Sequence, residues 1–368
     1  MRMKRIITLA SMLCLFASSI AMAQTAAEYV ETLEIDTPIY NGPKDNRINM
    51  IWGNIRPDAS SNPYPNQAAF NAALEDIIET LDPNGNNPKN GYSQYNKFFN
   101  FFATWFPDPI TYEADPSYFV LTKAIRDEMF LPWATEDYGW ATMIYTGGGG
   151  NGVGVDRENR VGDGTSSPDW ETALHEFNHT MAGVFDEYTA SGGWSNFECI
   201  DGPNVTSATD VSQVPWRKWI DEVDEFPTPY TAENFNKVGV FEGNISGYFG
   251  CYRPTAQSCY MGAGGFGESF GQEMCPVCLQ RFVCMLYQYV NVIENPQPAE
   301  DFLPINGAET INFSADIIKP EPNTQKYEWF LNGVLIATDV ESVSVDFDAC
   351  DSYELEQVVT YDTAIDRY

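Results

Sequence analysis

The chain has 368 residues, of which 52 are Asp or Glu and 20 are Lys or Arg, so its formal net charge at pH 7 is −32. Nucleic acid and anionic lipid repel so acidic a chain, and both are excluded as partners. Hydrophobic residues make up 43% of the chain and aromatic residues 14%, which is typical of a globular protein. The length predicts two domains.

The first 23 residues have the features of a secretory signal peptide. A basic start is followed by an apolar stretch from Ile6 to Phe16 and by the small-residue cleavage site Ala21-Met22-Ala23. The apolar stretch is too short to span a membrane, and no later run reaches about 18 apolar residues. We therefore expect a mature chain that begins at Gln24 and has no transmembrane segment. It would be exported to a periplasm, a cell surface or the medium.

Residues 24 to about 165 contain both predicted strands and predicted helices. Strands are expected at Arg47–Trp52, Lys97–Phe106 and Trp140–Tyr145, and helices at Ala68–Leu81 and Tyr118–Met129. The glycine-rich stretch Gly147–Gly154 lacks the lysine of a phosphate-binding loop, so a flexible turn is expected there.

The motif His175-Glu176-Phe177-Asn178-His179 contains both histidines of the chain. A helix is predicted from about 168 to 182, with Ser167 as its N-cap and Gly183 ending it. Positions i and i+4 share one helix face, so both imidazoles point to one spot, where they can bind zinc. Glu176 then lies beside the metal and can take a proton from water. The motif predicts a zinc hydrolase, against the alternative of a surface helix whose histidines have no function.

A catalytic zinc usually has three protein ligands and one open position, and the chain has no third histidine. Gly183 breaks the helix and Asp186 follows promptly, so the chain can turn back under the metal. Asp186 is the predicted third ligand, and Glu187 is the next candidate. Glu198 would instead suit a thermolysin-like site. The spacing resembles that of the metzincins, although Gly183 and Asp186 each come one residue late.

The C-terminal part of the chain changes character. Residues 215–221 are expected to be helical or turn-like, an amphipathic helix follows Pro276, and Asn295–Ala299 is a predicted linker. Short strands with a hairpin signal at Asn332-Gly333 are then expected at Thr310–Ile317, Lys326–Leu331, Val334–Ala337, Ser342–Phe347 and Tyr353–Thr360. The predicted fold is α+β: a zincin-like catalytic domain over residues 24–295, then an immunoglobulin-like β-sandwich over 296–368. That second module is short for seven strands.

Seven of the eight cysteines lie beyond the predicted signal peptide. Five of them fall between residues 251 and 284, and export makes disulfides plausible there. Cys275-Pro-Val-Cys278 is best interpreted as part of a structural disulfide, with a redox pair or a second zinc site as alternatives. Because the count is odd, at least one thiol is free or pairs between chains.

Several segments together resemble the IgA-peptidase-like bacterial zinc metallopeptidases. The stretch from His175 to Tyr188 is similar to the signature of that family. Segments that agree elsewhere, over roughly residues 40 to 290, are Asn41–Arg47, Val214–Ile220, Phe241–Gly243, Tyr252–Pro254, Cys259–Met261 and Cys275–Cys278. The resemblance implies a secreted zinc peptidase with a metzincin-like catalytic domain, often followed by β-sandwich modules. It also implies His175, His179 and Asp186 as zinc ligands and Glu176 as general base.

Supporting roles are open for several further residues. Met261 fits the position of a methionine turn beneath the metal ligands, although an ordinary core methionine is the alternative. Tyr188, Tyr252 and Tyr260 are candidates to hydrogen-bond the oxyanion, but tyrosines more often simply pack. Asn178 stands where the family commonly has glycine, which leaves the substrate range open.

The predicted activity is hydrolysis of peptide bonds in protein or glycoprotein substrates. The substrate would lie extended beside an edge strand, either Trp140–Tyr145 or Gly152–Val155. One alternative is an exported binding or adhesion protein with a structural or vestigial zinc site. Another is a zinc hydrolase that acts on non-peptide amides.

Overall fold

The computed structural model describes residues 2–4, 39–53, 66–82, 84, 90–104, 141–146, 161–166, 170–187, 199–220, 225–243, 250–256, 259–262, 273–305, 307–348 and 352–361. The chain divides into two compact units. One unit takes in Ala23–Val290 with Arg367–Tyr368, and the other takes in Asn291–Asp366 with Met1–Met22. The chain contains both helices and several small sheets, so its fold class is α+β.

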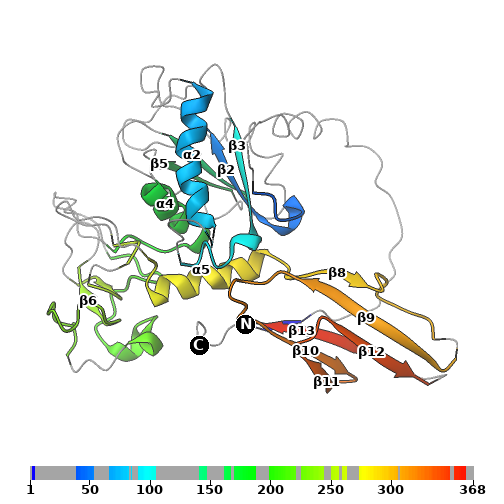
Figure 1. Ribbon diagram of the computed structural model, residues 1–368. Coiled ribbons are helices and arrows are strands. Elements are labelled where there is room, and N and C mark those ends of the chain that lie inside the picture. Colours follow the sequence, from blue (N-terminus) through cyan, green and yellow to red (C-terminus); the bar gives the residue numbers. More distant parts are fainter. Residues whose placement is uncertain are drawn as a thin grey trace, which may run out of the picture. The chain divides into compact units, whose positions relative to one another are not determined.

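A four-stranded parallel sheet lies at the centre of the first unit (Figure 1). Its order is β3 (Phe99–Thr104), β2 (Ile48–Gly53), β4 (Ala141–Thr146) and β5 (Val161–Ser166). Parallel sheets are usually covered on both faces. Ile48 and Phe101 are buried, and so are Asn49 and Asn100, whose side chains hydrogen-bond to each other at 3.0 Å. The three strands predicted from the sequence are thus β2, β3 and β4.

β4 is an interior strand, so the prediction that Trp140–Tyr145 forms the substrate-binding edge is wrong. It pairs in parallel with β2 on one side and with β5 on the other, which leaves no free backbone edge for a substrate strand. The sequence of β5, Val161-Gly-Asp-Gly-Thr-Ser166, has too few apolar residues to be recognised as a strand. The alternative edge, Gly152–Val155, lies outside the described residues.

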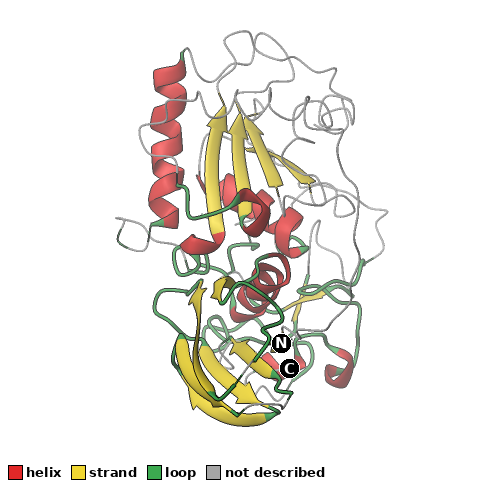
Figure 2. Ribbon diagram, turned by 90° about the vertical axis from the view of Figure 1, so that its right-hand side faces the viewer, coloured by secondary structure: helices red, strands yellow, loops and turns green. Residues whose placement is uncertain are grey.

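Among the described residues, the helices α2 (Gln67–Leu81) and α4 (Trp170–Ala182) lie beside this sheet, and α5 (Pro276–Tyr289) lies below it in the view of Figure 1 (Figures 1 and 2). The side chain of Asn66 caps α2 by accepting a hydrogen bond from the backbone of Ala69 at 3.0 Å. α4 packs against α5, and Arg281 of α5 donates to the carbonyl of Ala182 at 3.0 Å, which satisfies the last turn of α4.

An aromatic cluster joins these elements. The ring of Tyr92 lies 4.8 Å from that of Phe282 on α5 and 6.0 Å from that of Phe177 on α4, measured between centroids. Phe99 of β3 lies 6.2 Å from Phe177. These buried rings connect the start of β3 to both helices, so the motif helix is held against a packed core.

Short elements and loops complete the first unit. They are the 3-10 helices η1 (Lys44–Asn46), η2 (Asn96–Phe98), η3 (Val211–Gln213) and η4 (Arg217–Trp219), and the strands β6 (Phe241–Glu242) and β7 (Tyr252–Arg253). The stretch predicted to be helical or turn-like at 215–221 contains η4. The predicted helix Tyr118–Met129 and the turn Gly147–Gly154 lie outside the described residues.

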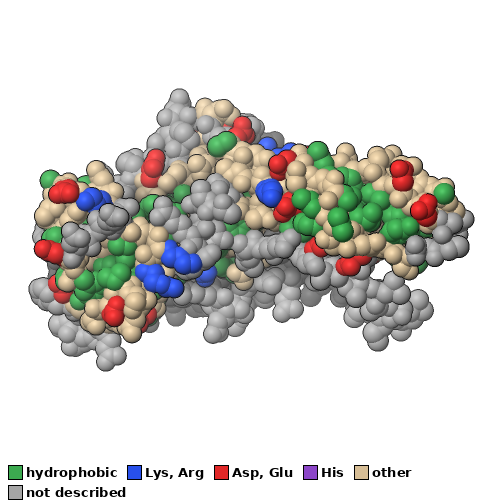
Figure 3. Space-filling model, turned by 90° about the horizontal axis from the view of Figure 1, so that it is seen from below, with side chains coloured by type: hydrophobic (Ala, Val, Ile, Leu, Met, Phe, Trp, Pro, Cys, Tyr) green, Lys and Arg blue, Asp and Glu red, His purple; other side chains and the backbone are tan. Residues whose placement is uncertain are grey.

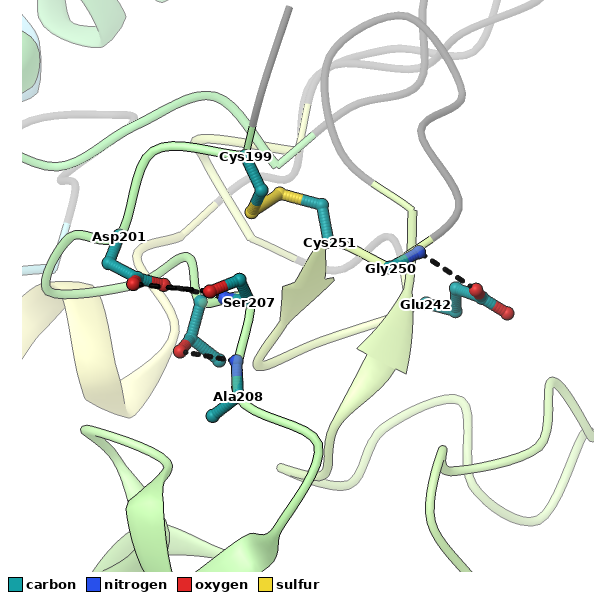
Figure 4. The surroundings of a disulfide bond; sticks show 8 residues. Cys199, Asp201, Ser207, Ala208, Glu242, Gly250 and Cys251 are labelled. Carbon is teal, nitrogen blue, oxygen red and sulfur yellow. Dashed lines mark hydrogen bonds between the residues drawn. A yellow bond between two sulfur atoms is a disulfide. The ribbon is translucent and has the colours of Figure 1, made fainter.

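A disulfide joins Cys199 to Cys251, just before β7 (Figure 4). Nearby, the side chain of Asp201 accepts a hydrogen bond from the hydroxyl of Ser207 at 3.2 Å, and the backbone of Gly250 donates to Glu242 at 3.0 Å. Cys259, Cys275 and Cys278 are free thiols. The interpretation of Cys275 and Cys278 as part of a structural disulfide is therefore wrong.

The second unit consists of antiparallel strands in two sheets. One has the order β1 (Arg2–Lys4), β13 (Leu355–Thr360), β10 (Lys326–Leu331), β11 (Val334–Thr338); the other has the order β12 (Ser342–Phe347), β9 (Glu309–Ile317), β8 (Ile293–Gln297). Asn332 and Gly333 have φ angles of 49° and 75°, and they form the tight turn between β10 and β11. The predicted hairpin is confirmed.

The predicted linker Asn295–Ala299 is wrong in its first part. Residues Ile293–Gln297 form β8, which pairs with β9 on both sides of a register shift. Asn295, with φ of 46°, lies inside this irregularity, and its side chain donates to Asp316 of β9 at 2.9 Å. The Asn and Pro residues, which suggest a linker in the sequence, lie here at a bulge within the strand and not at its end.

β11 is an edge strand with exposed apolar residues. Val334 is 65% exposed and Leu335 47% exposed. Seen from below in Figure 3, apolar side chains gather over the strands of this unit with acidic side chains around them. Across the residues that the structure describes, no helix is long and apolar enough to cross a bilayer.

Candidate metal centre

Both histidines of the motif lie on one face of α4. The helix runs from Trp170 to Ala182, within the range predicted from the sequence. The imidazole rings of His175 and His179 are perpendicular, with centroids 4.7 Å apart, and their Nε2 atoms are 3.1 Å apart. The i, i+4 spacing therefore directs both Nε2 atoms to the same point.

Asp186 reaches this point because the chain reverses at the end of α4. Gly183 has φ of 64°, a left-handed conformation that glycine adopts without strain, and its backbone donates to the carbonyl of His179 at 3.1 Å. The Oδ1 atom of Asp186 lies 2.7 Å from Nε2 of His175 and 3.1 Å from Nε2 of His179. The structure thus brings together the three side chains that the sequence predicts as ligands.

Backbone carbonyls determine which ring nitrogens carry protons. The Nδ1 atom of His175 lies 3.2 Å from the carbonyl of Tyr260, and that of His179 lies 2.7 Å from the carbonyl of Val184. Because a carbonyl only accepts hydrogen bonds, each Nδ1 donates, and in neutral rings each Nε2 then presents a lone pair. Two lone pairs and a carboxylate oxygen converge on one point, an arrangement that a cation stabilises. Two imidazoles and a carboxylate fit zinc.

The electrostatics of Asp186 fit the same interpretation. Burial alone would raise its pKa, but when the imidazoles are protonated, the charge of His179 and hydrogen bonds from His175 and His179 outweigh burial and hold the pKa well below its ordinary value. The carboxylate is thus ionised and available as a ligand. The side chains of His179 and Asp186 are 16% and 14% exposed, whereas that of His175 is 4% exposed. The centre is therefore accessible to solvent from the side of His179 and Asp186.

The other predicted site residues have different outcomes. Glu176 lies on α4 directly after His175, but its side chain is outside what the structure describes, as are Tyr188 and Glu198. Met261 is fully buried, and its carbonyl accepts a hydrogen bond from the backbone of Glu187 at 2.7 Å. It therefore lies against the segment that carries Asp186, where a supporting residue would be.

Tyr260 contributes to the centre through its backbone, since its carbonyl is the partner of His175. Its side chain is 2% exposed. Tyr252, in β7, packs its ring 5.1 Å from that of Phe226, measured between centroids. Both tyrosines are thus buried, and no contact among the described residues assigns either side chain to an oxyanion.

Glu187 does not join the three predicted ligands. Its carboxylate points into a separate, fully buried group with Cys259, Cys275 and Cys278. Its Oε1 atom lies 3.1 Å from Sγ of Cys278 and accepts a hydrogen bond from Asn204 at 3.0 Å. Burial raises the pKa of Glu187 above its ordinary value. The sequence showed the Cys275–Cys278 spacing, but not that Glu187 and Cys259 would lie beside it.

Comparison with known protein families gives a match over part of the chain. Residues 165–238 match the family model described as IgA Peptidase M64. No match was found among curated proteins. The matched segment takes in the end of β5, α4 and the loops up to η4 and beyond, which is narrower than the roughly 40–290 covered by the sequence resemblance. It contains both histidines, Asp186 and Glu187. This match supports the resemblance: the segment that carries the histidine motif is similar to the IgA peptidase M64 family, a family of peptidases.

Proposed function

We propose that the protein is an exported zinc-dependent endopeptidase that hydrolyses peptide bonds of protein or glycoprotein substrates. The observation that carries this proposal is the convergence of Nε2 of His175, Nε2 of His179 and Oδ1 of Asp186 within 3.1 Å of one another. These three residues would be the protein ligands of a catalytic zinc, and the access from solvent would leave its fourth position open. The catalytic domain would have a metzincin-like fold, with Met261 and Gly183 supporting the ligands.

Zinc bound there would polarise the scissile carbonyl and lower the pKa of water toward about 7. Residues of the chain orient the zinc ligands and transfer the proton. The carbonyls of Tyr260 and Val184 hold the two imidazoles in the tautomer that presents Nε2. Glu176, next to His175 on α4, would take a proton from the attacking water onto its carboxylate and deliver it to the nitrogen of the leaving amine.

The experiment that tests this role uses Glu176→Gln, which keeps the size of the side chain but removes the base. We expect hydrolysis of a proteome-derived peptide library to fall by about 10²–10⁴-fold, the usual contribution of a general base, with zinc content and thermal unfolding unchanged. Glu75→Gln, at an exposed position of α2, is the matched control and should retain full activity. Equal turnover by wild type and Glu176→Gln would exclude Glu176 as the base.

The alternative of an exported binding protein with a structural zinc site is not favoured, because the chain matches a peptidase family. Export is supported by the N-terminal sequence and by the Cys199–Cys251 disulfide, since disulfides persist mainly in oxidising compartments. The two-sheet, antiparallel organisation of the second unit supports the proposal that it is an immunoglobulin-like module.

A further inference from the structure

We propose that Glu187, Cys259, Cys275 and Cys278 form a second metal site, which holds one structural zinc ion through four protein ligands. This site is distinct from the centre of His175, His179 and Asp186. The presence of the ion does not depend on the proposed peptidase activity.

The geometry of the four ligand atoms fits a tetrahedral ion. One ligand atom from each residue lies within 4.8 Å of each of the others. With zinc–sulfur bonds of about 2.3 Å, neighbouring sulfurs of a tetrahedral site are separated by about 3.8 Å. Oε1 of Glu187 lies 3.1 Å from Sγ of Cys278 and 3.9 Å from Sγ of Cys275. The group therefore needs only small side-chain adjustments to surround an ion.

Backbone N–H groups point at two of the three sulfurs, those of Cys259 and Cys275, as they do around metal-bound thiolates. Sγ of Cys259 accepts from the backbones of Met261 and Cys275, each at 3.4 Å. Sγ of Cys275 accepts from the backbone of Cys278 at 3.5 Å, at the N-terminus of α5, where the helix dipole favours a negative sulfur. These donors stabilise thiolates, the form that binds zinc.

The surroundings of the Glu187 carboxylate also favour a bound cation. It is fully buried, and its two oxygens accept hydrogen bonds from neutral donors, Asn204 at 3.0 Å and Thr255 at 3.1 Å. Burying a carboxylate is costly unless a positive charge compensates it. Three thiolates and one carboxylate around a zinc ion carry the same net charge as the four thiolates of a common structural site.

A metal explains the four residues together better than a disulfide does. A disulfide between any two of the three cysteines would leave the third thiol and the carboxyl group of Glu187 outside the bond. A zinc ion engages all four residues. It also accounts for three free thiols next to one another in a chain that forms a disulfide between Cys199 and Cys251.

The ion would also support the first centre, and this consequence rests on the proposed function. Glu187 directly follows Asp186, and Cys259 directly precedes Tyr260, whose carbonyl is the partner of His175. The backbone of Glu187 donates to the carbonyl of Met261 at 2.7 Å. One ion would thus join the Asp186 segment, the Tyr260 segment and the start of α5.

Metal content of the full-length protein tests the proposal. After purification and dialysis, elemental analysis of the wild type should give two zinc ions per chain. Cys278→Ser and His179→Ala should each retain one zinc ion. The control Cys284→Ser, which changes a cysteine of α5 outside the group, should retain both zinc ions. If Cys278→Ser keeps the wild-type content, or if the wild type holds one zinc that His179→Ala removes, the second site is overturned.

Two measurements on the wild type keep the test decisive if Cys278→Ser fails to fold. A mercurial titration should release one zinc as Cys259, Cys275 and Cys278 react, while peptide mapping should find no disulfide among these three residues. A mapped disulfide, or thiols that react without release of zinc, would refute the site. Loss of peptidase activity in Glu176→Gln with two zinc ions still bound would support both proposals. An inactive wild type with two zinc ions would contradict only the proposed function.

Discussion

Asn178, inside the histidine motif, shows how a single side chain ties the metal-binding helix to the core. Its Oδ1 atom accepts a hydrogen bond from the hydroxyl of Tyr92 at 2.8 Å, and that hydroxyl also lies 3.1 Å from the carbonyl of Leu174. Both side chains are buried. Asn178 therefore has a structural partner in the core. It forms a contact with the core that glycine could not.

Removing that hydroxyl should destabilise the protein. Burial raises the pKa of Tyr92, so the hydroxyl stays protonated and acts as a donor. Tyr92→Phe leaves the buried acceptor of Asn178 without this donor, and the free energy of unfolding should fall by about 1–3 kcal/mol. Urea denaturation measures the change. Tyr40→Phe, at a residue 61% exposed, is the control and should be neutral. An equal fall in the free energy of unfolding of both variants would contradict a stabilising role of the Tyr92 hydrogen bond.

At the scale of elements, the end of α4 decides where Asp186 goes. Gly183 has φ of 64°, which costs a residue with a Cβ atom about 1–2 kcal/mol. We expect Gly183→Ala to lower the free energy of unfolding by about that amount and to weaken zinc binding, because the reversal that carries Asp186 is strained. Gly183→Asn should lower the free energy of unfolding and the affinity for zinc less than Gly183→Ala does, since asparagine tolerates this conformation better. Calorimetry with zinc titration would distinguish them, and equal effects would argue against a conformational cause.

The Cys199–Cys251 disulfide closes a loop with a sequence separation of 52 residues. By the chain-entropy argument, a loop of this length stabilises the fold by about 4 kcal/mol. The double variant Cys199→Ala/Cys251→Ala should therefore unfold at a clearly lower urea concentration than the wild type. Cys284→Ser, which changes a cysteine outside this disulfide, is the control. A denaturation midpoint unchanged in the double variant would show that the disulfide contributes little.

At the scale of the whole molecule, the structure places the N-terminal residues in a strand, whereas the sequence assigns them to a cleaved signal peptide. Residues Arg2–Lys4 form β1, which pairs with β13 over three residues, but the sequence predicts that they are removed on export. β13 also pairs with β10 over six residues, so the sheet would persist without β1. We expect the exported protein to begin at Gln24. N-terminal sequencing of the secreted chain decides this, and a chain that still begins at Met1 would refute cleavage.

Local patterns predicted those parts of the protein whose geometry depends on neighbouring residues. The helix period places His175 and His179 on one face, and the hairpin signal at Asn332-Gly333 matches the turn between β10 and β11. The strands β10 and β12 have the predicted bounds, because their alternating residues form a β pattern without help from distant contacts. Gly183 followed by Asp186 likewise pointed to a reversal at the end of α4.

The sequence by itself determined the histidine pair, the candidate acid and the resemblance to a peptidase family, because each depends on residues close together along the chain. Only the tertiary structure decided that β4 is interior, that Glu187 turns away from the histidines, and that Cys259 meets Cys275 and Cys278. These contacts join segments that are far apart in sequence. Packing of the whole core places such segments, and no short-range pattern reports which of them will meet.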